Sequence, residues 1–375
     1  MEIYLDNAAT TKPSDTAIEA YMDATEKCYA NPSALHSLGL VAEKCIKSAR
    51  ENVARSLSVT PEEIIFTSGG TESDNLAIIG TALSNKHKGK HIITSKIEHH
   101  AVLHTVDYLE SIGYEITRVD AKSNGEVDIE QIKNAIREDT VLISLMAVNN
   151  ETGTIQPIDK LKDIAPDVII HSDCVQAYGK IPLNPVKSKV DLMSFSGHKI
   201  HAVKGVGALY VKKGVKISPI SFGGDQEKIR SGTLNTAGIA AFGAEAINIS
   251  ENISEINQNL TEKRNYFAKR LLEIENCTIN GENSVNILNA GFDGVRGEVL
   301  LHALENMGIY VSTGSACTSK STKTSHVLDA MKVKQTIAQG SIRISISQDT
   351  TKEEIDTAVD AIKQQVMFLS KFKRR

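Results

Sequence analysis

Short apolar runs rich in β-branched residues alternate with segments of helical periodicity along much of this chain. The predicted strands cover residues 64–67, 91–94, 141–147, 168–171, 192–196 and 207–211. Helical segments lie between several of them, at residues 72–83, 101–111 and 129–137. This alternation indicates an α/β fold with a doubly wound, mainly parallel sheet rather than a sandwich. Ligands of such sheets bind beyond the carboxyl ends of the strands, where we expect the functional residues.

The second part of the chain predicts a smaller α+β unit. A polar helical stretch from about residue 245 to 274 could connect two domains. Beyond it, short elements are predicted at residues 285–289, 297–307, 341–347 and 352–368. A chain of 375 residues has room for two or three domains. We expect a large domain over residues 13–255 and a small domain over 256–375 together with residues 1–12.

Composition and charge argue against several classes of protein. The 42 Lys and Arg residues against 46 Asp and Glu give a net charge of −4, so direct nucleic-acid binding is not expected. No apolar run reaches about 18 residues, the length that suggests a membrane span. The N-terminus lacks the pattern of a secretory signal, so we expect a cytoplasmic protein. Five widely spaced cysteines without a CxxC pair argue against a disulfide framework and against a metal site.

Three motifs, each directly after a predicted strand, are candidate cofactor contacts. TSGGTESDN (67–75) opens a helix and could hold a phosphate, or it is a plain turn capped by Ser68 or Thr71. In HSDCVQ (171–176), Asp173 could cap a helix or hold the proton on a heterocyclic nitrogen. In SFSGHKI (194–200), Lys199 is placed where a partly desolvated amine could form a Schiff base. Together they indicate a pyridoxal phosphate site.

Cys317 is the cysteine whose surroundings are unusual. It lies in STGSACTSKSTKTS (312–325), among small and polar residues rather than apolar ones. Lys320 and Lys323 would favour its thiolate, and the composition predicts a loop. Either Cys317 is a reactive nucleophile, or it is an incidental exposed thiol.

These segments resemble the class V aminotransferase group, and most closely the NifS/IscS-like cysteine desulfurases. The resemblance runs through motifs in one order along nearly the whole chain: YLDNAATT (4–11), NPS (31–33), TSGGTESDN, IEHHAV (97–102), NNETG (149–153), HSDCVQ, SFSGHK, RSGT (230–233) and GSACTS (314–319). GSACTS further resembles the group whose catalytic cysteine lies on a long loop.

The resemblance implies a fold-type I homodimer that binds pyridoxal 5′-phosphate. The implied cofactor-binding residues are Gly70, Thr71, His99, Asn150, Asp173, Gln176, Ser196, His198, Lys199 and Thr233. Among them, Lys199 would carry the cofactor, Asp173 would pair with the pyridine nitrogen, and Thr233 would reach the phosphate of the partner subunit.

The resemblance also implies the reaction and its catalytic residues. Asn31, Asn150 and Arg343 would bind L-cysteine, with the forked guanidinium of Arg343 on its carboxylate. Lys199 and His99 would move protons, and Cys317 would take the substrate sulfur as a persulfide and release alanine. The sulfur would then pass to an acceptor protein, either a tRNA-thiolating enzyme or an iron–sulfur scaffold.

Some positions depart from the family pattern and leave alternatives open. Residues 200–205 read IHAVKG, which differs from the usual family sequence. In residues 223–230, Asp225 stands where the family commonly has a glycine, and the stretch between Glu227 and Arg230 is one residue shorter than usual. Cys174 follows Asp173, where the family typically has alanine. A catalytically weak homologue acting as a sulfur-relay or assembly partner is therefore an alternative. A selenocysteine lyase or an aminotransferase of the same fold is another, although Cys317 argues against a plain aminotransferase.

The end of the chain bears on the acceptor. Desulfurases that feed an iron–sulfur scaffold often carry a further C-terminal segment, whereas the predicted helix 352–368 is followed closely by KFKRR. We therefore expect tRNA thiolation in preference to iron–sulfur assembly.

Overall fold

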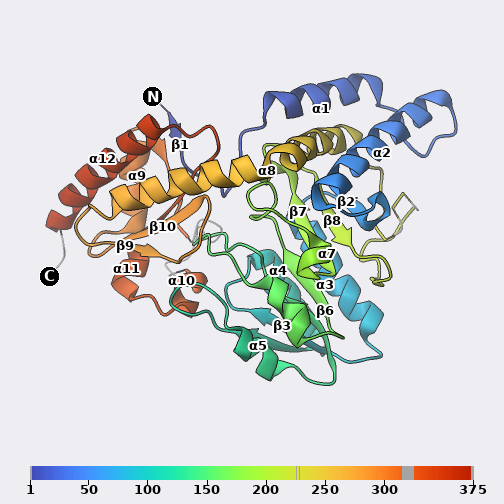
Figure 1. Cartoon of the computed structure of the whole chain (residues 1–375), viewed down its shortest axis with the longest axis horizontal. Helices are drawn as coiled ribbons and strands as arrows, with labels where there is room; N and C mark the ends of the chain where they lie inside the picture. Colours follow the sequence, from blue (N-terminus) through green and yellow to red (C-terminus); the bar gives the residue numbers. More distant parts are fainter. Residues whose placement is uncertain (1, 225, 228, 315–324, 373–375) are drawn as a thin grey trace.

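The computed structural model describes residues 2–224, 226–227, 229–314 and 325–372. A seven-stranded sheet forms the centre of its larger part (Figure 1). Its strands, in spatial order, are β2 (Ile64–Thr67), β8 (Gly207–Val211), β7 (Leu192–Ser196), β6 (Ile169–Asp173), β5 (Thr140–Ser144), β3 (His91–Ser95) and β4 (Glu115–Val119). Strands β4, β3, β5, β6 and β7 are parallel, and β8 is antiparallel to both of its neighbours. The doubly wound α/β prediction is confirmed.

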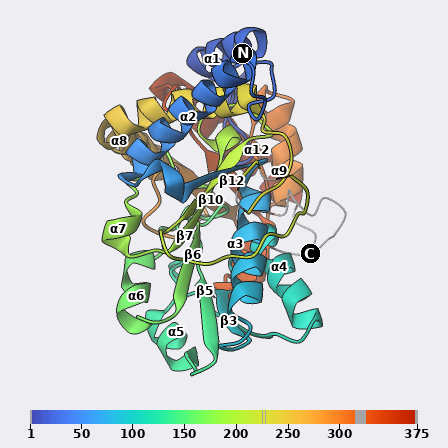
Figure 2. The same cartoon turned by 90° about the vertical axis from the view of Figure 1, so that its right-hand side faces the viewer.

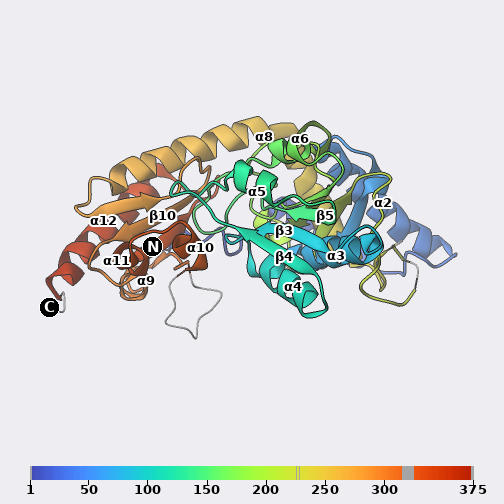
Figure 3. The same cartoon turned by 90° about the horizontal axis from the view of Figure 1, so that it is seen from below.

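Helices cover both faces of this sheet, so alternate side chains of a strand enter different cores. Ile92 and Leu142 pack with α3 (Gly70–Asn85) and α4 (His100–Ser111) on one face. Ile93 and Ile143 point to the other face, where α5 (Ile129–Ala135), α6 (Leu161–Ile164) and α8 (Thr236–Leu271) pack. Figure 3 shows α3 and α4 on one side of the strands and α8 on the other, and Figure 2 shows β5, β6 and β7 next to one another.

The long helix α8 links the two halves of the molecule (Figure 1). Its first half packs against α1 (Asp15–Lys27) and α2 (Ser37–Leu57). A Cβ atom on Gly243 would lie 2.6 Å from the Cα of Ala49, so glycine permits the close approach of α8 to α2. The helix therefore begins before the predicted start at residue 245, because its glycines serve packing and do not interrupt it.

A three-stranded antiparallel sheet forms the smaller part. It has the order β12 (Ser341–Ser345), β10 (Ile287–Phe292) and β9 (Cys277–Asn280), and α9 (Gly297–Glu305) and α12 (Lys352–Leu369) pack beside it. Strand β1 (Ile3–Tyr4) pairs in parallel with β11 (Ile309–Tyr310). The remaining short elements are α7 (Pro185–Ser188), α10 (His326–Ala330), α11 (Gln335–Gln339), and the 3-10 turns η1 (Pro61–Glu63), η2 (Ile158–Lys160), η3 (Gly197–Lys199) and η5 (Ser370–Phe372).

Two large hydrophobic clusters bear on the domain division. On α8, Ile249 belongs to the first cluster and Ile256 to the second. Ile3 and Leu5 also belong to the second. We therefore propose the division into residues 13–255 and 256–375 with 1–12, although α10 and α11 also contribute side chains to the first cluster. Within the described ranges, no helix has the length and apolar character needed to cross a membrane.

Candidate active site

A cavity of about 360 Å³ lies where the carboxyl ends of the parallel strands approach β12. It brings together most of the predicted site residues: Gly70, Thr71, His99, Asn150, Asp173, Gln176, Ser196, His198, Lys199 and Arg343. Asn31 and Thr233 are exposed and do not line this cavity. Cys317 lies outside the described residues.

The turn between β2 and α3 forms one end of the cavity. Gly69 has a φ of 154°, and α3 begins at Gly70. A Cβ atom on Gly70 would lie 2.6 Å from Cγ2 of Val175, so this approach requires glycine. The first-turn N–H groups of a helix lack intrahelical acceptors and carry partial positive charge. With Thr71 and Ser196 beside them, they make a suitable site for a phosphate group.

The segment that departs from the family pattern contacts this turn. Arg230 donates from Nε to a carboxylate oxygen of Glu72 in the first turn of α3, at 2.9 Å. Glu227 pairs with Arg50 of α2 at 2.5 Å. These contacts fix the path of RSGT next to the proposed phosphate site, while Asp225 lies outside the described residues.

Two buried carboxyl groups form the floor of the cavity. Asp173 ends β6 and accepts a hydrogen bond from the backbone N–H of Val175 at 2.9 Å. Burial raises the pKa of Asp173 and, together with the nearby Asp173 charge, raises that of Asp74 well above its usual range. Burial lowers the pKa of His171, 3.6 Å from Asp74, to about 3, so this imidazole does not neutralise the pair. A protonated heterocyclic nitrogen in the cavity would be a favourable partner for the Asp173 carboxylate.

Lys199 is held by the N-terminal segment of the chain. Its Nζ donates to the carbonyl oxygens of Ala8 at 2.5 Å and Ala9 at 2.8 Å. The backbone N–H of Thr11 donates to the carbonyl oxygen of His198 at 2.9 Å. The motif LDNAATT therefore positions the lysine from across the cavity.

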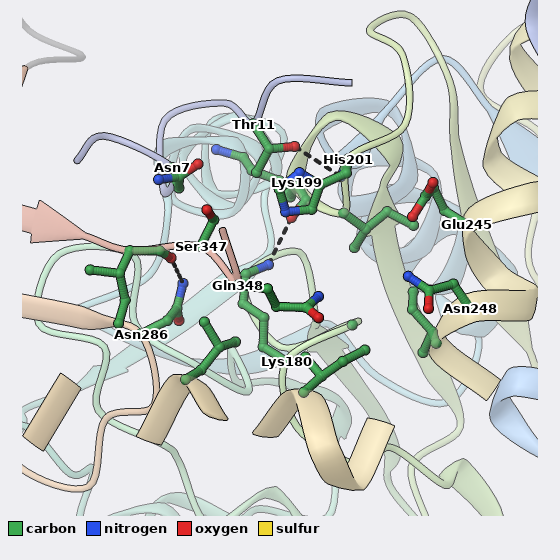
Figure 4. A pocket seen from close by; sticks show the side chains of 16 residues that line it. Asn7, Thr11, Lys180, Lys199, His201, Glu245, Asn248, Asn286, Ser347 and Gln348 are labelled. Atoms are coloured by element: carbon green, nitrogen blue, oxygen red, sulfur yellow. Dashed lines mark hydrogen bonds between the residues drawn. The ribbon is translucent and has the colours of Figure 1, made fainter. Parts of the chain in front are cut away.

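Lys199 also lines a second, small cavity (Figure 4). With about 30 Å³ it has room for about one water molecule. Lys180 lines it and donates from Nζ to the carbonyl oxygen of Lys199 at 2.8 Å. Burial, and then the charge of Lys199, lower the pKa of Lys180 to about 7.

The two histidines that line the main cavity are neutral near pH 7. Burial, followed by the charge of Lys199, lowers the pKa of His99 and of His198 to about 4. His99 caps α4, and its Nδ1 accepts a hydrogen bond from the N–H of Ala101 at 3.2 Å. A neutral ring that accepts at Nδ1 carries its hydrogen on Nε2, so His99 has a donor to offer.

Arg343 lies on β12 with its guanidinium buried at the edge of the cavity. It donates from one terminal nitrogen to the carboxylate of Asp6 and from the other to the carbonyl oxygen of Asn150, both at 2.9 Å. Its Nε has no hydrogen-bond partner among the described residues. The same is true of three buried side-chain oxygens of the cavity lining, from Asp74, Asn150 and Gln176.

Unpaired buried polar atoms point to a polar ligand, because native proteins rarely leave them unpaired. A phosphate turn, a buried acid, an amine and amide oxygens suit the phosphate, ring nitrogen, carbonyl carbon and ring hydroxyl of pyridoxal 5′-phosphate. The residues present therefore fit this cofactor. Over the described ranges, no group of three His, Cys, Asp or Glu residues could hold a metal ion.

None of the four described cysteines lines the cavity. Cys28 and Cys174 are buried, and burial raises the pKa of Cys174 far above neutral. Burial also raises the pKa of Cys45 and Cys277 to about 12. Cys317 therefore stays the predicted nucleophile.

The chain belongs to the aminotransferase class-V family, whose sequence profile matches residues 3–358. The family resemblance expected from the motifs is thereby confirmed.

Relatives within the family carry more specific names. A protein of Methanosarcina thermophila named cysteine desulfurase IscS is 43% identical, over 98% of this chain and 92% of the relative. Its namesake from Dictyoglomus turgidum is 46% identical, over 97% of this chain and 94% of the relative. The solved structure of a NifS-like protein superposes with a TM-score of 0.92 at 39% identity, covering 98% of this chain and 100% of that one. The fold-type I prediction is confirmed by this likeness.

Sequence reasoning missed several residues that shape the site. Asp74 lies one helical turn after Gly70 in TSGGTESDN, and this spacing places both on one face of α3. Ala8 and Ala9 offer only backbone carbonyls, which no residue-type pattern reveals. Lys180 becomes notable only because the fold buries it.

Proposed function

We propose that this protein is a pyridoxal phosphate-dependent cysteine desulfurase that converts L-cysteine to L-alanine and transfers the sulfur to Cys317. The observation that carries the proposal is the buried Arg343 guanidinium in the same cavity as Lys199 and Asp173. Such a cavity can bind an amino acid by its carboxylate beside an amine and an acid that suit the cofactor. The names of the relatives support cysteine as the substrate.

The cofactor would be held at several points. Lys199 would bind it covalently, the first turn of α3 with Ser196 and His198 would hold its phosphate, and Asp173 would pair with its ring nitrogen. Gln176 and Asn150 present amide groups whose oxygens lack partners among the described residues. When bound, the cofactor supplies an electron sink for negative charge at the substrate Cα.

The side chains of this chain then divide the reaction among them. Arg343 orients the substrate through its carboxylate, and the Lys199 amine moves the Cα proton. His99, neutral and with its hydrogen on Nε2, can donate a hydrogen bond or pass a proton inside the cavity.

The sulfur transfer balances without an external oxidant. The Cys317 thiolate attacks the substrate sulfur, so that a sulfur–sulfur bond forms as the carbon–sulfur bond breaks. The substrate carbon is reduced and takes up a proton to become the methyl group of alanine. The Cys317 sulfur is correspondingly oxidised to the persulfide level.

The persulfide would pass to an acceptor protein. A tRNA-thiolating enzyme and an iron–sulfur scaffold are the two acceptors to compare, with tRNA thiolation predicted. Incubating the persulfidated protein separately with each purified acceptor and following labelled sulfur tests this choice. Transfer to the scaffold alone would contradict the prediction.

The activity itself is tested by incubating the purified protein with pyridoxal phosphate and L-cysteine. We expect alanine in amounts matching the persulfide and sulfide formed. Formation of alanine from selenocysteine but not from cysteine would instead show a selenocysteine lyase. Amino-group exchange with a keto acid would show an aminotransferase, and no product in either assay would favour a relay protein.

A further inference from the structure

Lys180 is a buried lysine that lies outside the lining of the main cavity. Its side chain is 6% exposed, and it lines the small cavity beside Lys199. Burying an amine costs folding free energy, and burial, followed by the charge of Lys199, lowers the pKa of Lys180 to about 7. An apolar side chain of similar length would avoid this cost. The lysine therefore indicates a contact that an apolar side chain could not make.

That contact is a hydrogen bond to the main chain of Lys199. Nζ of Lys180 donates to the carbonyl oxygen of Lys199 at 2.8 Å (Figure 4). Lys199 is the last residue of the 3-10 turn η3, which directly follows β7. Hydrogen bonds within a 3-10 turn have poorer geometry than those of an α-helix, so a side chain that bonds the end of this turn makes it more rigid.

Lys180 also ends the segment that holds two of the expected cofactor contacts. Asp173 is the last residue of β6, and residues 175–180 continue from it as a run of turns that includes Gln176. The backbone N–H of Lys180 donates to the carbonyl oxygen of Ala177 at 3.0 Å within this run. The bond from Lys180 to Lys199 therefore ties the segment that begins at Asp173 to the turn that carries the lysine amine.

Close packing keeps Lys180 itself in place. Gly179 has a φ of 73°, and an added Cβ atom would lie 2.9 Å from Cγ2 of Ile200, the residue after Lys199. Glycine thus allows the chain to turn close to the η3 segment. On the other side, Asn257 of α8 donates from Nδ2 to the carbonyl oxygen of Lys180 at 2.8 Å. Both the main chain and the side chain of Lys180 are therefore anchored.

We propose that Lys180 is a positioning residue that fixes the place of Lys199 relative to Asp173. The inference rests on the proposed function, in which the Lys199 amine condenses with the cofactor aldehyde, releasing water, while Asp173 pairs with the ring nitrogen. The cofactor ring sets the distance between these two contacts, so the amine and the acid must be correctly spaced for both to form. Lys180 maintains this spacing by holding the backbone of Lys199, and acts only through that residue.

The test compares two forms of the cofactor that differ at one group. Pyridoxal phosphate has an aldehyde that Lys199 can bond, whereas pyridoxamine phosphate has the same ring and phosphate but an amine in its place. Fluorescence titration of the protein, after removal of its cofactor, gives a dissociation constant for each. We expect Lys180→Met to raise the constant for pyridoxal phosphate on the order of 10-fold, because a hydrogen bond that holds Lys199 is lost. The constant for pyridoxamine phosphate should stay within about threefold.

Lys180→Gln is a second variant, which keeps a polar side chain next to the small cavity. Its side chain is one atom shorter, so its amide should not reach the carbonyl oxygen of Lys199. We expect the same selective loss of affinity for pyridoxal phosphate. Both variants remove an amine whose charge is disfavoured by burial, so both should fold.

Lys162 of α6 provides a matched control. It also donates from Nζ to a backbone carbonyl oxygen, that of Val168, at 2.8 Å. This bond lies just before β6 begins, at the end of the strand away from Asp173. Lys162 also pairs with Asp191, so Lys162→Met tests whether lost stability alone weakens cofactor binding. We expect the dissociation constants for both cofactor forms to stay within about threefold in this variant.

The outcomes separate this inference from the proposed function. If Lys180→Met and Lys180→Gln bind pyridoxal phosphate as tightly as the unmodified protein, or lose affinity for both cofactor forms equally, Lys180 does not position Lys199. If the unmodified protein binds pyridoxal phosphate but forms no alanine from L-cysteine, the proposed function fails instead.

Discussion

At the residue scale, Arg343 determines whether the cavity can bind an amino acid by its carboxylate. A buried guanidinium that makes a charge-assisted, two-point contact contributes on the order of 2–5 kcal/mol to binding. We expect Arg343→Ala to raise KM for L-cysteine by more than 10-fold. Arg343→Lys should recover only part of the loss, because an ammonium group lacks the fork. Steady-state kinetics measure this, with the cofactor absorbance unchanged as the control, and an unaltered KM in Arg343→Ala would remove the assigned role.

Glu98 gives a pH-dependent prediction at the same scale. It is fully buried, receives hydrogen bonds from Ser95 and from the N–H of Met146, and directly precedes His99. Burial raises the pKa of Glu98 from 4.5 to about 8. The folded protein therefore retains this proton where the unfolded chain has lost it, so the contribution of Glu98 to stability declines as pH rises from 4.5 to 8.

Glu98→Gln cannot ionise and should escape this decline. Relative to the unmodified protein, its free energy of unfolding should improve by on the order of 4 kcal/mol between pH 4 and pH 9. Denaturant unfolding at several pH values measures the difference in free energy of unfolding between the two proteins. The contributions of the other titrating groups are the same in both and cancel in this difference. A difference that stays constant with pH would show that Glu98 is ionised in the folded protein at neutral pH.

The candidate site could be predicted from the sequence only where residue type and motif coincide. Lys199, Asp173 and Gly70 lie at or just after the ends of strands and stand in recognisable motifs, and the structure brings them to one cavity. Glu151 stood in the quoted motif NNETG but had no assigned role. Its carboxyl accepts a hydrogen bond from Ser325 and lies close to Gly314, two residues that are distant in sequence and meet it only in the fold.

At the scale of elements, the junction of β2, α3 and β6 shapes the phosphate end of the cavity. Gly70→Ala should place a methyl group against Val175 and displace the turn. We expect the dissociation constant for pyridoxal phosphate to rise on the order of 10-fold. Val175→Ala alone should have little effect, and in combination with Gly70→Ala it should restore binding by making room. Fluorescence titration measures the dissociation constants of the single and double variants. If Val175→Ala does not restore binding to Gly70→Ala, the steric contact with Val175 is not the cause of the loss.

Element prediction succeeded where apolar runs are buried on both faces. The predicted strands 64–67, 192–196 and 207–211 coincide with β2, β7 and β8. Strand β4 was not predicted, because it lies at the sheet edge and its first four residues are exposed or only partly buried. The short strands β1 and β11, which pair with each other, were also missed. Their pairing joins the chain's first residues to residues 309–310, so no pattern in the neighbouring sequence indicates it.

At the scale of the whole molecule, we propose a homodimer in which Thr233 completes the phosphate site of the partner subunit. Thr233 is exposed and distinct from the lining of the cavity of its own chain. Lys199→Ala and Thr233→Ala should each be strongly impaired alone. Mixed after subunit exchange, they should regain about a quarter of full activity, because half of the dimers are mixed and each mixed dimer has one intact site. A mixture no more active than its components would contradict the shared site.

The central claim is that this cavity delivers the sulfur of L-cysteine to Cys317. Mass spectrometry of the protein after one turnover with isotopically labelled L-cysteine tests it most directly, with alanine quantified in the same sample. We predict one added sulfur atom on the peptide containing Cys317, matched by one alanine, and no addition in Cys317→Ser. Alanine formation with the label on Cys174 or another described cysteine, or with no protein-bound sulfur, would contradict the account.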